Sequence, residues 1–589
     1  MVVADCESPS SHCVVEVREQ APNPSLNPCM ADWLTYFDVH VLGLRPFHIN
    51  WFKTPLLVLC GGLFLWALLS PRVVPVIRTI EDRINRLGVG AQHALVWGLA
   101  FGLASCLVFV RVVQFFQLQT MWDMSVEANL AWHMVHGPLF FNSLDNRSAL
   151  SQHFAPVWFV SGLLYWVWES PLTLLAVQSV AVGLGVVPVY FLTLRRGLGP
   201  FHGFLMIALY AFNWFLHVDN AHDYHRPVLV IPVLLWLMYA VEVNRKGVAT
   251  VLAVLSLTIE ESLGLVLVGV GLYVLAMQRA WRWWGVALAA TGLGYFLLVT
   301  KVIMPMLTPE GVLFLWARYA HLGSDPIDAA VNLLLHPVWA VDQALFRHDQ
   351  FIRVLYLLGS FGFLPLLGWR QGLLATIPLG MMLLSGSSGQ YNLGHHYTAP
   401  ALPFLFYSAT YGLKRVIDWL HSSMTPSVPR WRIVTACLLI CFGWNVYRIP
   451  NYDLNKTSDV FAEAAFEVIR QVPDEVSLAT DVRFAPFLAN RHRLCKISWN
   501  APHPCDWTPV GAEVARELPQ NGPLRADPTW EPEFVLIGAD MTSDPPSESQ
   551  KRQTFAASMS GEEGRYEVIA SHSGIFLLRL KPLTPMKAR

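Results

Sequence analysis

The sequence predicts a mostly α-helical protein in which a polytopic bundle of transmembrane helices precedes a C-terminal α/β domain. Of its 589 residues, 54% are hydrophobic and only 14% are charged, and the mean hydropathy is +0.41. An ordinary soluble protein carries roughly 25% charged residues. The deficit is confined to one part of the chain, because residues 448–589 hold 35 of the 83 charged residues. This distribution predicts a membrane domain over 54–447 and a soluble domain over 448–589.

Apolar runs of the membrane domain are the expected spans, since a crossing needs about 20 apolar residues. They cover residues 54–70, 91–118, 171–194, 201–217, 227–243, 248–277, 284–303, 353–369, 372–386, 400–413 and 431–447. The 248–277 run is too long for one untilted crossing, so we expect two short helices with Glu260 and Glu261 at the tip of a hairpin. This gives a bundle of about 11 to 13 spans.

Basic residues in the short loops predict the orientation, because cytoplasmic loops carry an excess of Lys and Arg. With those loops inside, the extracytoplasmic parts are residues 1–53, the loops 119–170, 218–226, 304–352 and 387–399, and the domain 448–589. Residues 154–168 fit this scheme as a helix along the outer membrane surface, where Trp158, Trp166 and Trp168 suit the interface. The alternative is a true short span. We expect a multi-pass protein of the inner cell membrane.

The soluble domain is expected to mix helices and strands. Apolar periodicity predicts a helix over 458–471, and strands are expected at 476–480, 534–538 and 574–580. Cys495 and Cys505 fall in the predicted oxidising compartment, where they can form a disulfide. The net charge of −1 argues against a nucleic-acid partner. No nucleotide-binding loop or zinc-type Cys/His spacing is present in the sequence.

Ionisable residues near the outer ends of spans are the candidates for function, because burying a charge in a membrane is costly. Asp123 and Glu127 are spaced i, i+4, which places both carboxylates on one face of a helix. Such a pair can supply a general base, with or without a metal ion. The structural alternative is a solvated, acidic helix start.

The outer loop "DNAHDYHRP" combines carboxylates with imidazoles. Asp223 and His225 could bind a metal, or His225 could contact a phosphate, and His222 lies beside them. An ordinary polar turn is the alternative. Glu260 and Glu261 are costly at membrane depth unless they are paired or hydrated. The alternative for this pair is a hairpin tip that simply reaches water.

Three further groups complete the candidate substrate-binding residues. His153 begins the expected interfacial helix, where a wet histidine is the alternative. The "SSGQYNLGHHYTAP" stretch offers imidazole and aromatic groups beside glycine, as a ligand loop or as an interfacial aromatic belt. Cationic side chains could hold a phosphate. Arg111, one of them, could equally extend to a membrane interface. The residues are Arg111, Lys301 and Arg318 among the cations, and Gln390, Tyr391, His395, His396 and Tyr397 in the loop.

The order of these pieces resembles a bacterial polytopic membrane family known only as a domain of unknown function. The motifs are the outer Asp123, "HF-x-P" at His153, "DYHRP", the acidic pair, "TKVIMP", "QY…HHY…P" and the terminal "YEVIASHSGIFLLRL". The resemblance covers roughly 115–580. That family is in turn similar to the GT-C class of membrane glycosyltransferases, which includes protein mannosyltransferases and lipid A aminoarabinose transferases.

This resemblance implies a GT-C-like fold among membrane lipids and a glycosyltransferase activity. The sugar would come from a polyprenyl-phosphate donor and pass to a glycan, lipid or protein acceptor at the outer face. Asp123 matches the catalytic base, and Asp223 is the nearest counterpart of a second acidic motif. Glu127 departs from the family, which has an aromatic residue there, and Ile259 replaces a Lys before the acidic pair. No cofactor is certain, and a divalent cation is compatible with the residues.

The chemistry fits this reading, because transfer needs a base for the acceptor hydroxyl and cations for the departing phosphate. A transporter or lipid flippase is a second class, with intramembrane Glu and His and broken helices such as 248–277. A non-catalytic assembly or sensor protein is a third. The glycosyltransferase hypothesis predicts that Asp123 and Asp223 lie within roughly 15 Å in one cavity. It also predicts that Lys301 or Arg318 faces the lipid phosphate.

Overall fold

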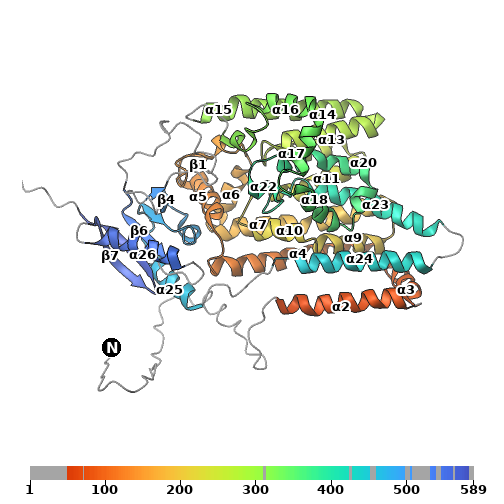
Figure 1. Cartoon of the computed structure of the whole chain (residues 1–589), viewed down its shortest axis with the longest axis horizontal. Coiled ribbons are helices and arrows are strands. Elements are labelled where there is room, and N and C mark those ends of the chain that lie inside the picture. Colours follow the sequence, from red (N-terminus) through yellow and green to blue (C-terminus); the bar gives the residue numbers. More distant parts are fainter. Residues whose placement is uncertain are drawn as a thin grey trace, which may run out of the picture. The chain divides into compact units, whose positions relative to one another are not determined.

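The computed structural model describes most of the chain. Its described residues are 50–70, 72–308, 314–422, 428–450, 459–497, 505–506, 531–538, 546–561 and 564–582. The expected segment 1–53 therefore lies almost wholly outside them. Over the described residues the chain is mostly helical, with a small sheet near the C-terminus (Figure 1). Both parts of the predicted fold class are thus present.

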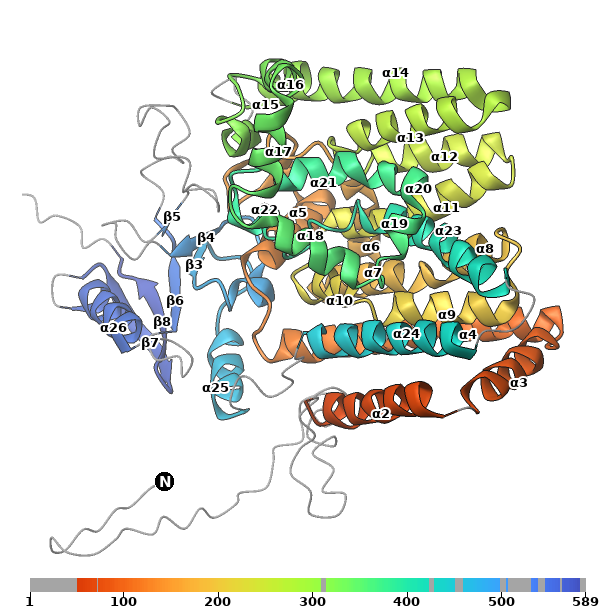
Figure 2. The same ribbon diagram turned by 45° about the vertical axis from the view of Figure 1, so that its right-hand side comes forward.

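Long apolar helices form the bundle, and Figures 1 and 2 show them lying side by side. Among the described residues, three helices are long and apolar enough to cross a membrane: α4 (Val89–Phe116), the α7–α8 helix over Pro171–Leu194 and the α14–α15 helix over Arg279–Leu307. The pair α9 (Pro200–Ala211) and α10 (Trp214–Ala221), bent by 42°, passes the same test as one broken span. α7 (Pro171–Leu184) starts where its sequence indicates, with Pro171 in the first turn and the Ser170 hydroxyl accepting from the Leu172 amide.

The other expected runs form helices that are shorter or less uniformly apolar. They are α2 (Asn50–Leu69), α11 (Val230–Glu242), α18 (Gln350–Gly359), α19 (Leu364–Leu367), α21 (Thr376–Leu383), α23 (Leu402–His421) and α24 (Val428–Arg448). The 154–168 stretch contains one ten-residue helix, α6 (Trp158–Val167). Residues 248–277 form the expected pair of helices, α12 (Lys246–Leu257) and α13 (Leu263–Met277), with Glu260 and Glu261 in the turn between them.

Glycines bring α13 against α14 (Arg282–Leu298). A Cβ at Gly264 would lie 2.6 Å from the carbonyl oxygen of Gly292, and one at Gly271 would lie 2.6 Å from that of Gly285. The two glycines on each helix are seven residues apart, so they lie on the same face two turns apart. Small residues at such positions let helix backbones approach closely, which is how membrane helices gain packing energy. This contact fixes the side of α14 that lines the cavity described below.

The C-terminal sheet has the strand order β5-β4-β3-β6-β8-β7. β3 (Leu478–Thr480) pairs in parallel with both β4 (Leu494–Ile497) and β6 (Phe534–Gly538). The antiparallel neighbours are β5 (Cys505–Asp506), β8 (Ile575–Leu580) and β7 (Tyr566–His572), with the helices α25 (Asp459–Ile469) and α26 (Pro546–Ser560) beside the sheet. Cys495 and Cys505 form a disulfide that joins β4 to β5. The three expected strands correspond to β3, β6 and β8.

Helix α5 (Trp122–His136) connects this sheet to the bundle. Leu118 and Trp122, just before and at its start, share an apolar core with Leu478 and Leu494 of the sheet. The amide nitrogen of Asn129 donates to the carbonyl oxygens of Ala489 and Arg491, at 2.8 and 2.9 Å. Its amide oxygen accepts from the backbone amide and hydroxyl of Ser143, so this fully buried side chain is completely hydrogen-bonded. α5 is therefore held from both sides, and Asp123 lies in its first turn.

Candidate functional site

The start of α5 is capped by a residue from a distant loop. Its own N-cap residue, Met121, supplies no capping side chain. Instead the buried Asp223 carboxylate accepts from the backbone amides of Met121 and Met124, at 3.0 to 3.1 Å. A carboxylate at this position satisfies orphan N–H groups and complements the helix dipole. The loop 222–225 is thereby fixed against the first turn of α5, which brings its histidines to Asp123.

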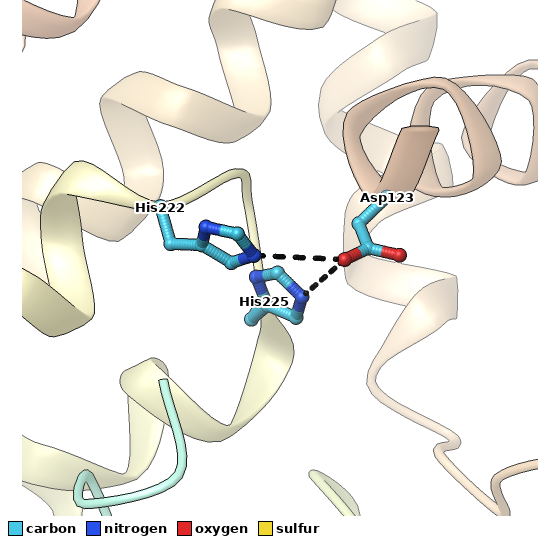
Figure 3. Close-up of side chains that lie close together, drawn as sticks. All are labelled: Asp123, His222 and His225. Atoms are coloured by element: carbon cyan, nitrogen blue, oxygen red, sulfur yellow. Dashed lines mark ion pairs between the residues drawn. The ribbon is translucent and has the colours of Figure 1, made fainter. Parts of the chain in front are cut away.

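Two imidazoles converge on one carboxylate oxygen (Figure 3). The Nε2 atoms of His222 and His225 lie 3.7 and 3.3 Å from Oδ2 of Asp123, and the other carboxylate oxygen points away from both rings. Burial raises the pKa of Asp123, but the two imidazoles outweigh it and hold that pKa well below its usual value. Burial lowers the pKa of His225, and the Asp123 carboxylate reverses this, leaving that pKa raised. The group combines one carboxylate with two histidines at the start of a helix.

The predicted loop 387–399 adds two further rings to this cluster. The His396 ring stacks on that of His225, with centroids 3.5 Å apart, and the His395 ring lies 4.3 Å from that of His222. Burial and the neighbouring His225 hold the pKa of His396 well below its usual value. His395 has φ 56°, a left-handed conformation that is uncommon outside glycine and costs energy. The backbone strain at this loop accompanies the packing of four imidazoles around Asp123.

Glu127, one turn after Asp123, is part of a buried ion pair. Its carboxylate contacts the Arg226 guanidinium and accepts from the indole N–H of Trp158 at 2.9 Å. The same guanidinium lies over the Trp158 ring, 4.3 Å from its centroid. Trp158, expected at a membrane interface, is buried here. The carboxylate of Glu127 therefore already has a cation and a donor as partners.

A second acidic group lies at the tip of the α12–α13 hairpin. Nδ1 of His153 lies 3.2 Å from a Glu261 oxygen and 3.5 Å from a Glu260 oxygen. The other Glu261 oxygen accepts from the backbone amide of Phe154 at 2.9 Å. The acidic pair therefore has an imidazole and a backbone amide as partners.

These groups line one cavity of about 800 Å³. Its polar end is formed by α5, the 222–226 loop and the hairpin tip, whereas α14, α16 (Pro326–Leu335) and α21 supply apolar walls. Leu293, Phe296 and Leu333 are typical of those walls. The predicted site residues that line the cavity are Asp123, Glu127, His153, His225, Glu260, Glu261, Arg318, Gln390, His396 and Tyr397.

The remaining predicted residues lie outside the cavity wall. His222 and His395 adjoin it through their contacts with Asp123 and with each other. Asp223, predicted as a catalytic carboxylate, caps α5 as described. The Arg111 guanidinium donates to Gln114 and to the Ala221 carbonyl at 2.6 Å, so it supports the histidine loop from below. Lys301 forms an ion pair with Asp325 at 3.3 Å, and Tyr391 stacks on His348.

Sequence reasoning missed Asp145 and Gln152, which also line the cavity. Burial raises the pKa of Asp145 to about 6; the Arg147 guanidinium opposes the shift and the Asp123 carboxylate adds to it. Asp145 lies in a short hairpin between β1 (Phe141–Asn142) and β2 (Arg147–Ser148). The "LDNR" turn carries no chemical signature, so only the packing of this hairpin against α5 identifies it.

Comparison with known proteins places this site within a family. Residues 114–577 match the profile of the predicted membrane proteins called DUF2079. The chain belongs to this family. The matched range contains every residue that lines the cavity of this DUF2079 protein. No curated protein matches the sequence.

Among solved structures, this DUF2079 protein aligns with ArnT from Cupriavidus metallidurans in two states. The structure bound to undecaprenyl phosphate has a TM-score of 0.44 at 13% identity, covering 83% of this chain and 98% of ArnT. The apo structure has a TM-score of 0.42 at 14% identity, covering 81% and 98% of the two chains.

Proposed function

We propose that this membrane protein is a glycosyltransferase that moves a sugar from a polyprenyl-phosphate donor to an acceptor hydroxyl. The observation that carries the proposal is the composition of the cavity beside Asp123. It joins a carboxylate surrounded by imidazoles, a guanidinium and a long apolar wall. These are a base, a phosphate-binding cation and a surface for a lipid chain.

Arg318 is the best candidate for the lipid phosphate. It lines the cavity, and none of the described carboxylates lies within ion-pair distance of its guanidinium. Arg226 also lines the cavity, but Glu127 neutralises it. Lys301 is paired with Asp325 and lies outside the wall. A guanidinium without an ion-pair partner is suited to a bidentate contact with phosphate.

Asp123 is the proposed general base. In the proposed step, the acceptor hydroxyl oxygen forms a bond to the anomeric carbon of the sugar, and its proton passes to the Asp123 carboxylate. The bond between that carbon and the phosphate oxygen breaks, and its electron pair stays on the phosphate. The leaving phosphate is already a stable anion, so the step needs no strong general acid. Arg318 stabilises the charge that develops on the phosphate.

The positive-inside pattern supports an extracytoplasmic location for this site and for the C-terminal domain of an inner-membrane protein. We expect a reporter enzyme fused after Arg448 to be active only outside the cytoplasm. Activity of the same fusion only in the cytoplasm would contradict the orientation.

The proposed function is tested by separating lipid binding from transfer. Native mass spectrometry of the full-length protein with undecaprenyl phosphate measures lipid binding. We expect Arg318→Gln to weaken binding about tenfold or more, as the loss of a charge-assisted contact predicts. Lys301→Gln, which also removes a cation, should bind like the wild type.

Asp123→Asn should bind the lipid normally and lose transfer of sugar from a polyprenyl-phosphate donor. Equal lipid binding by the wild type and Arg318→Gln would contradict the assignment of the phosphate site. Full transfer by Asp123→Asn would contradict the assignment of the base.

A further inference from the structure

The Asp123 cluster has the composition and spacing of a metal-ion site. One possible ligand atom from each of Asp123, His222 and His225 lies within 4.8 Å of the other two. Figure 3 shows the two ring nitrogens directed at the same oxygen. The ligand types are one carboxylate and two imidazoles, a set that zinc and related divalent ions prefer.

The tautomer of His225 indicates that a positive charge is needed between its ring and Asp123. Nδ1 of His225 lies 2.7 Å from the backbone carbonyl oxygen of Asp223. A carbonyl oxygen only accepts, so Nδ1 carries the hydrogen and Nε2 of a neutral ring presents its lone pair to Asp123. Two lone pairs that face each other need a cation or a second proton between them. A histidine that ligates a metal almost always donates its other N–H in this way.

The distances around Asp123 are compatible with a bound metal ion. In this structure His136 and Glu169 form an ordinary hydrogen-bonded pair at 2.7 Å. His225 and His222 stand off from Asp123 at 3.3 and 3.7 Å, beyond the usual length of a charge-assisted hydrogen bond. Ligand atoms 2.0–2.1 Å from a tetrahedral zinc ion lie about 3.3–3.4 Å apart. The 3.3 Å separation of His225 from Asp123 matches an edge of a zinc coordination tetrahedron, and the 3.7 Å separation of His222 from Asp123 exceeds that edge by about 0.3 Å.

We infer that Asp123, His222 and His225 bind a divalent transition-metal ion of the zinc class. Three protein ligands leave one coordination position, which is the arrangement of catalytic zinc sites. Asp123 and His225 line the cavity, so an ion bound to them would lie at its wall. The metal site stands on geometry alone. Its role rests on the proposed function: the open position takes the acceptor hydroxyl, whose pKa falls on coordination, while the free oxygen of Asp123 receives the proton.

The His153–Glu260–Glu261 group is the alternative metal-binding site in the described residues, because its ligand atoms also lie within 4.8 Å of one another. In that group, however, Glu261 is already bonded to the Phe154 amide through its second oxygen. The two groups also differ in composition, because one imidazole faces two carboxylates here, at 3.2 and 3.5 Å, whereas two imidazoles face one carboxylate at Asp123. His153→Ala is therefore the matched control for His222→Ala.

The test measures metal content rather than activity. Untagged full-length protein is purified in detergent, equilibrated with Zn²⁺ or Co²⁺ and freed of excess metal by gel filtration. We expect one metal per chain in the wild type and the intense visible absorption of tetrahedral Co²⁺. His222→Ala should bind Zn²⁺ about tenfold or more weakly, whereas His153→Ala should retain it.

Two results would overturn the proposal. One is a wild-type protein that holds no Zn²⁺ or Co²⁺ after gel filtration. The other is loss of the metal in His153→Ala with retention in His222→Ala. The Co²⁺ spectrum of the wild type decides the ligand geometry even if His222→Ala does not fold. Binding of undecaprenyl phosphate through Arg318 is measured separately, so failure of the metal site leaves the proposed function to its own test.

Discussion

Removing the Glu127 carboxylate should destabilise the protein more than any change at an exposed ion pair. The side chains of Glu127 and Arg226 are only 6% and 8% exposed, and each is the other's counterion. Glu127→Ala leaves the Arg226 charge buried over the Trp158 ring and also removes the acceptor of the indole N–H. Breaking a buried pair by deleting one partner costs about 3–5 kcal/mol, because the remaining charge has no compensation.

The magnitude can be assigned to the pair by a double-mutant cycle. Arg226→Met removes the charge but keeps an unbranched side chain under the indole. We expect Glu127→Ala alone to cost about 3–5 kcal/mol, and the double variant to cost clearly less than the sum of the two single changes. Unfolding in mixed micelles of increasing SDS content, followed by tryptophan fluorescence, measures these free energies. Glu169→Gln at the exposed pair with His136 is the control, with an expected cost below about 1 kcal/mol.

One result would refute this reasoning about Glu127. If Glu127→Ala abolished sugar transfer but changed the free energy of unfolding by less than about 1 kcal/mol, the carboxylate would act on the substrate. Sequence reasoning assigned it to catalysis, whereas its buried partners indicate that it holds the 226 loop against α5. The cycle distinguishes the two roles.

Helix α5 and the C-terminal sheet give three further predictions. Asn129→Ala should cost about 1–3 kcal/mol and speed proteolytic release of the C-terminal domain, because two buried carbonyls lose their donor. Burial, assisted by the nearby His492, lowers the pKa of His133 to about 4 from its usual 6.5. The contribution of His133 to the free energy of unfolding is therefore fully present above pH 6.5 and falls by about 1.4 kcal/mol per pH unit between pH 6.5 and pH 4. His133→Gln should remove this slope in the SDS titration. Cys495→Ser should lower the stability of the sheet by about 2–3 kcal/mol, measured as faster proteolysis than in the wild type, because a loop of about ten residues is no longer closed; equal rates would contradict a contribution from the Cys495–Cys505 bond.

The sequence predicted the features that depend on local pattern. Apolar runs marked α4 and the α7–α8 helix to within a few residues, and the acidic pair correctly placed the α12–α13 turn. It did not predict the break in the 353–369 run, where α18 ends at Gly359. There the Asn445 amide donates to the Ser360 carbonyl, and Asn213 donates to the Ser360 hydroxyl. Such distant polar partners satisfy backbone groups that a continuous helix would otherwise pair.

The sequence indicated which residues belong to the site but not which of them contact each other. Asp123 and His225 could be brought together because both lie in expected outer loops. Nothing in the sequence shows that Asp223 caps a helix that begins 101 residues earlier, or that Arg226 is neutralised by Glu127. These pairings depend on which faces of distant elements meet, and local periodicity contains no information about them.

The hydrogen bonds of Asn129 have a consequence for biosynthesis. Its partner carbonyl at Ala489 is 360 residues further along the chain. At about 5–20 residues per second, α5 leaves the ribosome about 20 to 70 seconds before that partner exists. During this interval the side of α5 that will face the sheet remains uncovered. A chain that ends before residue 489 would insert its bundle and still lack the partners of Asn129, so the helix that carries Asp123 is fully packed only after most of the chain has been translated.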